Sequence, residues 1–406
     1  MKLTVWRGHD RVVGTLWQAH GALLFRYREG ADPREQISAS LPVDTSRDLP
    51  GTFFSNLLPD GVLRERLAQR LGVSVENDFA MLAAVGGDCA GALALLPEGG
   101  TPAIRRARKL LTPEALRRAC EFGSETVLAA EKLRLSLAGA QDKIPVVEDE
   151  GKLYLPVGVA ASTHILKLPS PRFRGLAYNE LLVGTLATEI GLQRPAASLW
   201  RMPGKLEHGL LIARFDRGPD GTRIHQEDMC QALGLPPSKK YEADEGPTLA
   251  RIVSLLSTES SQPAQDIERI VRWQAFNALI GNADGHAKNL ALIREPGRVR
   301  LAPFYDLVCT RQWDSLSKKL AFSVGGVTDP GALGVRQWTA AAKEWELSPK
   351  WVLDIVRQTG EALRKTVAGL EGKAIELGAS PSSARVLRAT LAKLVRRSET
   401  LLRSPR

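Results

Sequence analysis

The chain has 406 residues, of which 44% are hydrophobic and 25% charged, a composition typical of soluble globular proteins. This length can bury one large core or a few smaller ones. The net charge of +10 and the pI near 9.5 favour an anionic partner. However, the sequence contains no zinc finger, RNA-recognition motif or basic-region heptad, so it does not predict direct reading of nucleic-acid bases.

The N-terminus and the apolar segments predict a cytoplasmic protein. Residues 1–11 alternate like a strand and lack the apolar segment of a signal peptide. The longest apolar stretch, 79–97, is interrupted by Gly86-Gly87-Asp88, which predicts a helix end, a turn and a buried strand rather than a membrane span. Four cysteines have no paired spacing and are expected to be reduced core residues, not zinc ligands or disulfides: Cys89, Cys120, Cys230 and Cys309.

Basic residues cluster at 105–109, 318–319 and 393–397. Each cluster has two explanations. It is either a solvated helix face, or a surface for ATP phosphates, a tRNA-bearing substrate or DNA beside a partner protein.

The first hundred residues predict a small β-rich unit. Alternating strands are expected at 2–6, 11–17 and 22–27, helices at 60–71 and 79–85, and a closing strand at 92–96. Asp60 is the expected cap of the first helix and Gly72 its stop. Residues 98–110, rich in Gly, Pro and Arg, are a plausible boundary.

The rest of the chain changes from strands to helices. Strands are expected at 143–147, 152–155, 164–168, 198–202 and 209–215, and helices at 177–189, 349–370 and 383–403. From about Glu227 onward, strands nearly vanish. This order predicts an α+β fold with the two-lobed layout of protein kinases, ATP lying between the lobes. The expected domains are 1–100 (extra N-terminal β-unit), 101–216 (β-rich N-lobe) and 217–406 (α-helical C-lobe).

The most informative stretch is Asp284-Gly-His-Ala-Lys-Asn289. Its Asp-x-x-x-x-Asn spacing is that of the kinase catalytic loop, in which the aspartate is the base and the asparagine a metal ligand. Apolar residues at helical spacing within 266–282 predict a buried helix that delivers this loop. The alternative is an ordinary Asp-Gly turn.

A predicted hairpin completes this site. The runs 289–294 and 298–301 flank Glu295-Pro296-Gly297, a turn sequence. A hairpin returns the chain to where it began, so Asp306 is expected beside Asn289. Two hard oxygen ligands then suit Mg²⁺ held together with phosphate oxygens, which indicates an ATP site.

A kinase also needs a phosphate-binding loop and a cation. The stretch 135–143 is the candidate loop, because Gly139 with small neighbours lets backbone N–H groups approach phosphate. Lys167 lies inside the apolar strand 163–169 and needs an anion there, unless that strand is an edge from which the lysine reaches water. Glu180, in the following helix, is the candidate partner of Lys167.

Ordered blocks of the sequence resemble the HipA family of serine/threonine-kinase toxins from bacterial toxin–antitoxin pairs. These blocks span nearly the whole chain: Leu49-Pro-Gly-Thr-Phe-Phe-Ser-Asn-Leu-Leu-Pro-Asp-Gly61, Gly86-Gly-Asp-Cys-Ala-Gly-Ala-Leu93, Ser136-Leu-Ala-Gly-Ala-Gln-Asp-Lys143, Thr163-His-Ile-Leu-Lys-Leu-Pro169, Arg214-Phe-Asp-Arg217, His225-Gln-Glu-Asp-Met-Cys-Gln231, Gly281-Asn-Ala-Asp-Gly-His-Ala-Lys-Asn289 and Pro303-Phe-Tyr-Asp306.

The resemblance implies a role for each matching residue. Asp284 would be the catalytic base, and Asn289 and Asp306 would hold Mg²⁺. Lys167 and Lys288 would bind the nucleotide. The phosphate loop would consist of Ala138, Gly139, Ala140, Gln141, Asp142 and Lys143. Ser136 would be an autophosphorylation site whose modification switches the kinase off, because a phosphate beside the loop excludes those of ATP.

Further roles concern the hinge and the catalytic loop. Phe215 would lie in the hinge that meets adenine, where this chain has Ala213 in place of a glutamate found in the family. His286 would orient the catalytic loop by hydrogen bonding or act as a second proton carrier, and we favour the first role. Asp216 and Asp228 are candidates for polar residues that join the lobes.

The resemblance implies an ATP- and Mg²⁺-dependent protein kinase that phosphorylates an aminoacyl-tRNA synthetase and arrests translation. A helix-turn-helix, HipB-like antitoxin would neutralise it and tether it to operator DNA; no membrane partner is expected. Two alternatives remain open. One is a catalytically idle corepressor, although the catalytic residues are present. The other is a small-molecule phosphotransferase, which would not need the N-terminal unit or Ser136.

Overall fold

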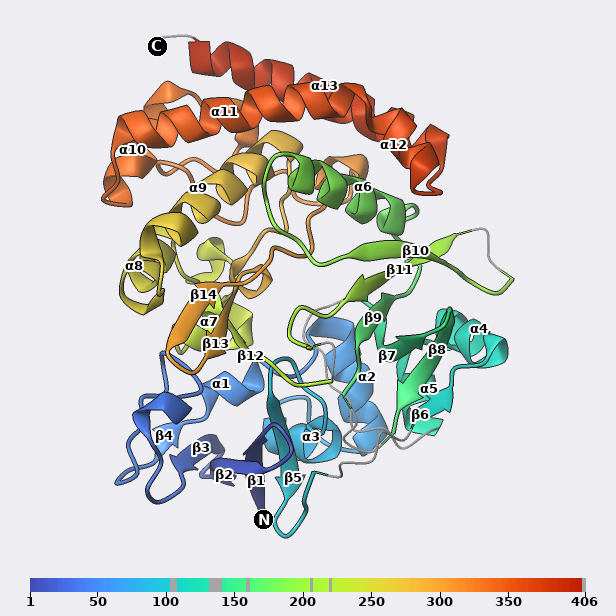
Figure 1. Ribbon diagram of the computed structural model, residues 1–406, viewed down its shortest axis with the longest axis vertical. Coiled ribbons are helices and arrows are strands. Elements are labelled where there is room, and N and C mark those ends of the chain that lie inside the picture. The colour runs from blue at the N-terminus through green and yellow to red at the C-terminus, as the bar shows by residue number, and fades with distance from the viewer. Residues whose placement is uncertain (103–107, 131–140, 158–160, 205–206, 219–220, 404–406) are drawn as a thin grey trace. The chain divides into compact units, whose positions relative to one another are not determined.

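A computed structural model describes residues 1–102, 108–130, 141–157, 161–204, 207–218 and 221–403 (Figure 1). The chain forms two compact units. The first consists of Met1–Ser170, Trp200–Ser238 and Ala291–Ala302, and the second of Pro171–Leu199, Lys239–Leu290 and Pro303–Arg406. The domain boundaries expected at residues 100 and 216 remain a prediction.

The N-terminal part of the first unit contains an antiparallel sheet of order β4-β3-β2-β1-β5. The strands are β1 (Lys2–Arg7), β2 (Arg11–Ala19), β3 (Ala22–Tyr27), β4 (Leu49–Pro50) and β5 (Leu93–Pro97). The helices between β4 and β5 are α1 (Thr52–Ser55), α2 (Gly61–Leu71) and α3 (Asp78–Val85). The expected strands and helices are confirmed. Gly72 ends α2 in the left-handed region, with φ 65°, as its lack of a Cβ allows.

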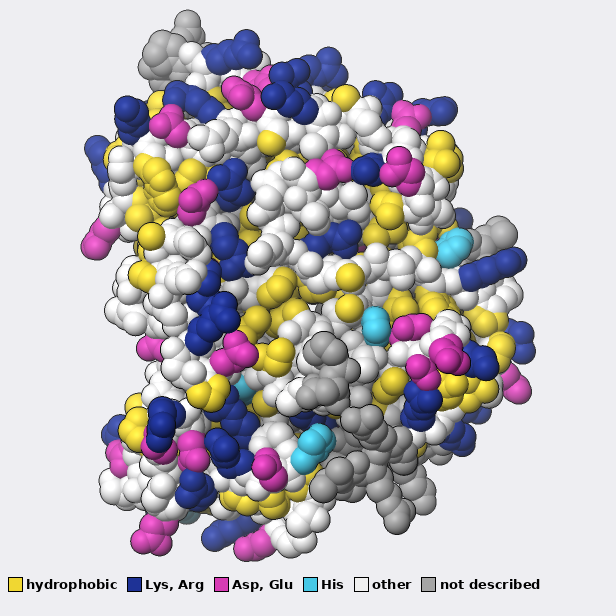
Figure 2. All heavy atoms as spheres, viewed as in Figure 1, with side chains coloured by type: hydrophobic (Ala, Val, Ile, Leu, Met, Phe, Trp, Pro, Cys, Tyr) yellow, Lys and Arg dark blue, Asp and Glu magenta, His cyan; other side chains and the backbone are white. Residues whose placement is uncertain are grey.

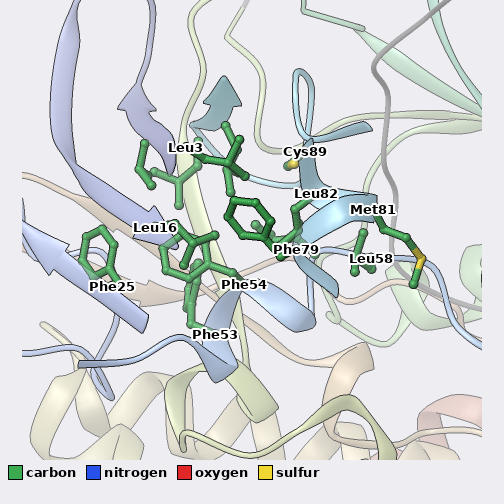
Figure 3. Close-up of a cluster of buried hydrophobic side chains, with 14 of the residues drawn as sticks. Leu3, Leu16, Phe25, Phe53, Phe54, Leu58, Phe79, Met81, Leu82 and Cys89 are labelled. Atoms are coloured by element: carbon green, nitrogen blue, oxygen red, sulfur yellow. The ribbon is translucent and has the colours of Figure 1, made fainter. Parts of the chain in front are cut away.

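This sheet and its helices enclose one hydrophobic core (Figure 3). Alternate residues of β1, Leu3 and Val5, are fully buried, as the period of two in a half-buried strand requires. Phe54 of α1 packs against Phe25 of β3 with ring centroids 5.1 Å apart. The N-terminal part of the first unit therefore has a core of its own.

A second sheet of the first unit has the order β10-β11-β9-β7-β8-β6. Its strands are β6 (Arg108–Leu110), β7 (Lys143–Asp149), β8 (Lys152–Pro156), β9 (His164–Lys167), β10 (Ala197–Arg201) and β11 (His208–Ala213). All but β6 were expected. The helices α4 (Pro113–Phe122) and α5 (Glu125–Ala130) precede β7 and were not predicted, although Thr112 caps α4 by accepting a hydrogen bond of 3.2 Å from the backbone N–H of Ala115.

The predicted hairpin is present and belongs to a third small sheet of order β12-β13-β14. Strands β13 (Ala291–Glu295) and β14 (Arg298–Leu301) pair Leu292 with Leu301. Strand β12 (His225–Asp228), which pairs with β13, was not predicted, whereas the expectation that few strands other than the hairpin follow Glu227 is confirmed for the described residues. This strand is polar in sequence, yet Glu227 is fully buried, because it forms an ion pair with Arg294 of β13.

The second unit is mainly helical. Its helices are α6 (Leu176–Glu189), α8 (Leu249–Glu259), α9 (Pro263–Ile280), α10 (Val335–Glu344), α11 (Pro349–Ala368), α12 (Leu370–Glu376) and α13 (Pro381–Arg403). Helices α11 and α13 pack side by side, and both contact α9 (Figure 1). The expected helices are confirmed as α6, α9, α11 and α13, whereas α8, α10 and α12 were not predicted.

The outer face of α11 and α13 carries many Lys and Arg side chains (Figure 2). Exposed members are Arg357, Arg364, Lys365, Lys393, Arg396 and Arg397. Some of these arginines have acidic neighbours on the same face, such as Glu399 beside Arg364 at 3.3 Å. Within the described part of the chain, no helix combines the length and apolarity needed to cross a bilayer.

Candidate active site

The loop that follows α9 is held by a short network of hydrogen bonds. The helix ends at Gly281, whose φ of 68° is left-handed. The side-chain oxygen of Asn282 accepts from the backbone N–H of Asp284 at 3.0 Å, which forms the turn. The hydroxyl of Thr310, a buried residue, accepts from the N–H of Ala283 at 3.0 Å and donates to the carbonyl of Gly281 at 2.8 Å. The loop therefore starts from a fixed position.

Asp284 presents its carboxylate to solvent, with 53% of the side chain exposed. The phenol of Tyr241 donates a hydrogen bond of 2.5 Å to its Oδ1. Asn289 is buried, and its Nδ2 donates to the backbone carbonyl of Asp284 at 2.7 Å. Because that nitrogen is used, the remaining oxygen Oδ1 of Asn289 is the atom able to ligate a metal.

Asp306 follows the hairpin and lies in the left-handed region, with φ 56°, where few non-glycine residues are found. Such backbone strain concentrates at functional sites. The phenol of the preceding residue, Tyr305, donates to the carbonyl of Lys288 at 2.7 Å. The segment after the hairpin thus returns to the catalytic loop, as the sequence predicted.

His286 is buried and neutral. Burial lowers the pKa of its imidazole to about 4, against the opposing attraction of Asp284. Its Nε2 lies 3.9 Å from Oδ1 of Asp284, beyond hydrogen-bonding distance, and its ring packs edge-on against Tyr241 with centroids 4.9 Å apart. This arrangement fits packing of the loop better than proton transfer. Lys288 is also buried.

The donors present fit a magnesium ion. One carboxylate, Asp306, and one amide oxygen, of Asn289, are the set that Mg²⁺ takes when phosphate oxygens and water complete its octahedron. Across the described ranges, no cluster of three or more His, Cys, Asp or Glu residues forms a cage for a metal. Two protein oxygens leave the rest of an octahedral shell to phosphate oxygens and water.

Lys167 lies in the first unit, in the strand β9, and is buried. It stands directly opposite Lys143 of β7, so the two side chains share one face of the sheet. Their neighbours Ile144 and Leu166 point to the other face, into the core. Two cations on one face of a sheet are a suitable site for a polyphosphate.

The rest of the predicted phosphate loop is described only in part. Gln141 and Asp142 are described, and the carboxylate of Asp142 accepts hydrogen bonds of 3.1 and 3.3 Å from the N–H of Ser124. The remaining predicted residues lie outside the described residues: Ser136, Ala138, Gly139 and Ala140. Phe215 follows β11 and is half-buried. Glu180 is buried on α6 in the second unit, and its pairing with Lys167 remains a prediction.

Asp216 and Asp228 both make hydrogen bonds inside the first unit, and their expected role in joining the lobes remains a prediction. Asp228 caps α7 (Met229–Ala232) by accepting from the N–H of Gln231 at 2.8 Å. Asp216 belongs to a buried charge cluster, in which five side chains from distant parts of the sequence pair with one another: Asp88, Arg214, Asp216, Arg217 and Arg223.

The arginines of this cluster keep its carboxylates ionised. Burial alone would raise the pKa of Asp88, but attraction to Arg223, Arg217 and Arg214 outweighs burial and lowers it to about 2. The same competition lowers the pKa of Asp216. The cluster joins the turn before β5 to the segment after β11 within one unit.

Sequence reasoning missed three residues of the site, namely Tyr241, Tyr305 and Thr310. Each acts through one hydroxyl placed by tertiary structure, and none falls in a spacing pattern that indicates a role. Tyr305 falls in the block Pro303-Phe-Tyr-Asp306, but that block does not indicate a role for its hydroxyl. A polar residue in a loop carries no such signal unless its partner is known.

Sheets in the first unit, helices in the second and an Asp-x-x-x-x-Asn loop after α9 define a kinase-like α+β fold. Residues 3–96 match the family model of the HipA N-terminal domain, and residues 135–367 that of the HipA-like C-terminal domain. The chain belongs to the HipA family.

Individual proteins agree with this assignment. Y4mE of Sinorhizobium fredii is 38% identical over 390 residues, which cover 90% of this chain and 91% of that protein. The serine/threonine-protein kinase toxin HipA of Shewanella oneidensis is 31% identical over 327 residues, covering 75% and 73%. A solved structure of HipA with HipB and operator DNA from Shewanella oneidensis MR-1 is similar with a TM-score of 0.85 and 25% identity, over 98% of both chains.

Proposed function

We propose that this chain is an ATP- and Mg²⁺-dependent serine/threonine protein kinase that acts as the toxin of a toxin–antitoxin pair. The observation that carries the proposal is the hydrogen bond between the amide of Asn289 and the carbonyl of Asp284, with Asp306 at the end of the returning hairpin. The proposal is supported by the contact between these two segments within one unit, where the phenol of Tyr305 donates to the carbonyl of Lys288.

The chemistry follows from the residue types. Asp284 accepts the proton of the acceptor hydroxyl as its oxygen bonds to the γ-phosphorus and the bond to the ADP oxygen breaks. Asn289 and Asp306 would hold Mg²⁺, which supplies charge neutralisation at the phosphates. Lys167 and Lys143 bind phosphate oxygens, because both lie on the same face of β9 and β7. Phe215 would contact adenine.

Partners and substrate are proposed from the relatives. The similar Shewanella structure contains HipB and operator DNA, so we propose that a HipB-like antitoxin neutralises this chain and tethers it to DNA. The proposed substrate is an aminoacyl-tRNA synthetase, whose phosphorylation would arrest translation in the cytoplasm. Ser136 is the proposed site of self-inactivation.

Incubation of the purified chain with Mg²⁺ and γ-labelled ATP tests the enzymatic part. Asp284→Asn is expected to abolish label transfer to protein. Asp354→Asn is the matched control, because that side chain is 48% exposed, lies on α11 and pairs only loosely with Arg357, at 3.8 Å. Mapping of the labelled residue tests Ser136.

The outcomes separate the alternatives. Label on protein in the wild type and in Asp354→Asn, but not in Asp284→Asn, supports the protein kinase. ATP consumption without labelled protein, in the presence of sugars or aminoglycosides, would favour a small-molecule phosphotransferase. Protein that neither binds nor consumes ATP, yet strengthens operator binding by a HipB-like protein, would favour the corepressor.

A further inference from the structure

Tyr241 contacts the carboxylate of Asp284 directly. Its hydroxyl donates to Oδ1 at 2.5 Å. Nε2 of His286 also lies near this carboxylate, 3.9 Å from Oδ1. The side chain of Asp284 is half exposed, so without Tyr241 its carboxylate could rotate in solvent.

The segment that carries Tyr241 is itself fixed to the second unit. The carbonyl of Tyr241 accepts from the N–H of Asp244 at 3.0 Å and from that of Gly246 at 2.9 Å, which closes a tight turn. A Cβ at Gly246 would lie 2.3 Å from the Tyr241 carbonyl oxygen, so the turn requires glycine there. The neighbouring carbonyl of Lys240 accepts from the N–H of Ala287, inside the catalytic loop, at 3.1 Å.

A second anchor lies on the other side of the turn. The carboxylate of Glu242 accepts from the N–H and the hydroxyl of Ser323, at 2.8 and 2.7 Å. The N–H of Glu242 donates to the carbonyl of Ala321 at 3.3 Å. The phenol of Tyr241 is therefore held against Asp284 by bonds on both sides of the residue, and the ring of His286 supports it.

We propose that Tyr241 is the positioning residue of the base Asp284. Its hydroxyl holds Oδ1 and leaves Oδ2 turned toward the acceptor hydroxyl. The proposal rests on the proposed function of Asp284. Tyr241 keeps its own proton, and the proton of the acceptor moves to Oδ2 when the acceptor oxygen bonds to the γ-phosphorus.

The same contact raises a rival role. A phosphate acceptor must also hydrogen-bond to the base, so a tyrosine on Asp284 could itself receive phosphate. The fixed turn argues against this role, because the bonds of Lys240 and Glu242 on either side limit how far the phenol can move toward a nucleotide. Mapping of labelled residues distinguishes the two roles.

The test is Tyr241→Phe, which removes the hydroxyl and keeps the ring against His286. With γ-labelled ATP and Mg²⁺, the maximal rate of label transfer to the chain itself and to casein is expected to fall about tenfold, the value of one hydrogen bond to a charged group. The ATP concentration for half-maximal rate and the melting temperature are expected to stay unchanged. Tyr154→Phe is the control, because its ring lies under Arg108 at 4.4 Å in the first unit.

Each outcome decides the question. A wild-type or higher rate in Tyr241→Phe would overturn the positioning role, as would phosphate mapped to Tyr241 in the wild type. A fall in rate accompanied by a lower melting temperature equal to that of Tyr241→Ala would reduce Tyr241 to a structural residue. If Asp284→Asn is inactive while Tyr241→Phe is fully active, only this inference fails. If Asp284→Asn is active, or the wild type transfers no label, the proposed function fails and the role of Tyr241 with it.

Discussion

The amide of Asn289 donates a hydrogen bond of 2.7 Å to the backbone carbonyl of Asp284. The same carbonyl accepts from the N–H of His286 at 2.9 Å. One side chain therefore closes this loop with its nitrogen and leaves its oxygen available for the proposed metal. An aspartate at position 289 could ligate the metal but could not donate the hydrogen bond.

We predict that Asn289→Asp lowers the rate of phosphate transfer about 10²-fold, because an opened loop misplaces Asp284. Excess Mg²⁺ should not restore the rate. Asn77→Asp is the control, since Asn77 caps α3 as an acceptor and an aspartate does the same. A rate for Asn289→Asp within threefold of the wild type, on the order of the scatter between preparations, would contradict a role for the donated hydrogen bond.

The strained backbone of Asp306 predicts opposite effects on stability and activity. We expect Asp306→Gly to increase the free energy of unfolding by about 1 kcal/mol relative to Asp306→Ala, because glycine accepts a left-handed φ without cost. Both variants should lose phosphate transfer with the metal ligand. Urea unfolding and the γ-labelled ATP assay measure the two effects.

Glu346 provides the control for strain alone. It also has a left-handed φ, of 57°, and lies exposed just after α10. Relative to Glu346→Ala, Glu346→Gly should gain a similar free energy of unfolding, and it should keep full activity. If Asp306→Gly is no more stable than Asp306→Ala, its backbone stores no strain.

Acid should destabilise both units through buried histidines. Burial lowers the pKa of His286 to about 4 and that of His225 to about 3. When the pKa of a histidine is lower in the folded state, the folded protein binds that proton less well than the unfolded chain. The free energy of unfolding is then highest above the unfolded pKa of about 6.5, and it decreases as the pH falls toward the folded-state pKa. In that pH range, each histidine lowers the free energy of unfolding by up to about 1.4 kcal/mol per pH unit.

Urea unfolding at pH 7 and pH 5 checks this prediction. His225→Gln should flatten the pH dependence of the first unit, and His286→Gln that of the second. His20→Asn should not alter either, because His20 is exposed and asparagine tolerates its left-handed φ of 50°. Equal stability at both pH values in the wild type would contradict neutral buried imidazoles.

Asp88 is predicted to be a major contributor to the stability of the first unit. Asp88→Asn leaves three buried guanidinium groups with one carboxylate, that of Asp216, and should cost about 3–5 kcal/mol. Asp48→Asn removes an exposed partner of Arg26 and should cost at most about 1 kcal/mol. Thermal unfolding compares the variants, and equal melting temperatures would show that the buried cluster adds no net stability.

The order of elements followed from the sequence because most of them have clear hydrophobic periods. Strand β12 was missed because its buried residues are polar, and Glu227 is tolerable inside because distant groups satisfy its carboxylate, among them Arg294, 67 residues away, and the hydroxyl of Ser38. Helix α4 had a readable start in Thr112 and Pro113, directly after the stretch 98–110 that composition marked as a boundary, but it was not predicted.

The candidate site could be predicted only where its residues form a local sequence pattern. Asp284, Asn289 and Asp306 fall in a short local pattern with a fixed spacing. Tyr241 lies 43 residues before its partner Asp284, in a loop without periodicity. Only the folded chain brings this pair together.

The interleaving of the two units has a consequence for how the protein is made. The first unit ends with residues 291–302, and β12 has its partner β13 only there. About three quarters of the chain must therefore be synthesised before the first unit can fold completely. By then, two segments of the second unit, 171–199 and 239–290, have already been synthesised. During that time, both units are incomplete in the nascent chain. No cut at a single position releases either unit whole, so chaperone dependence during synthesis and poor yield of truncated fragments are the expected signs of this topology.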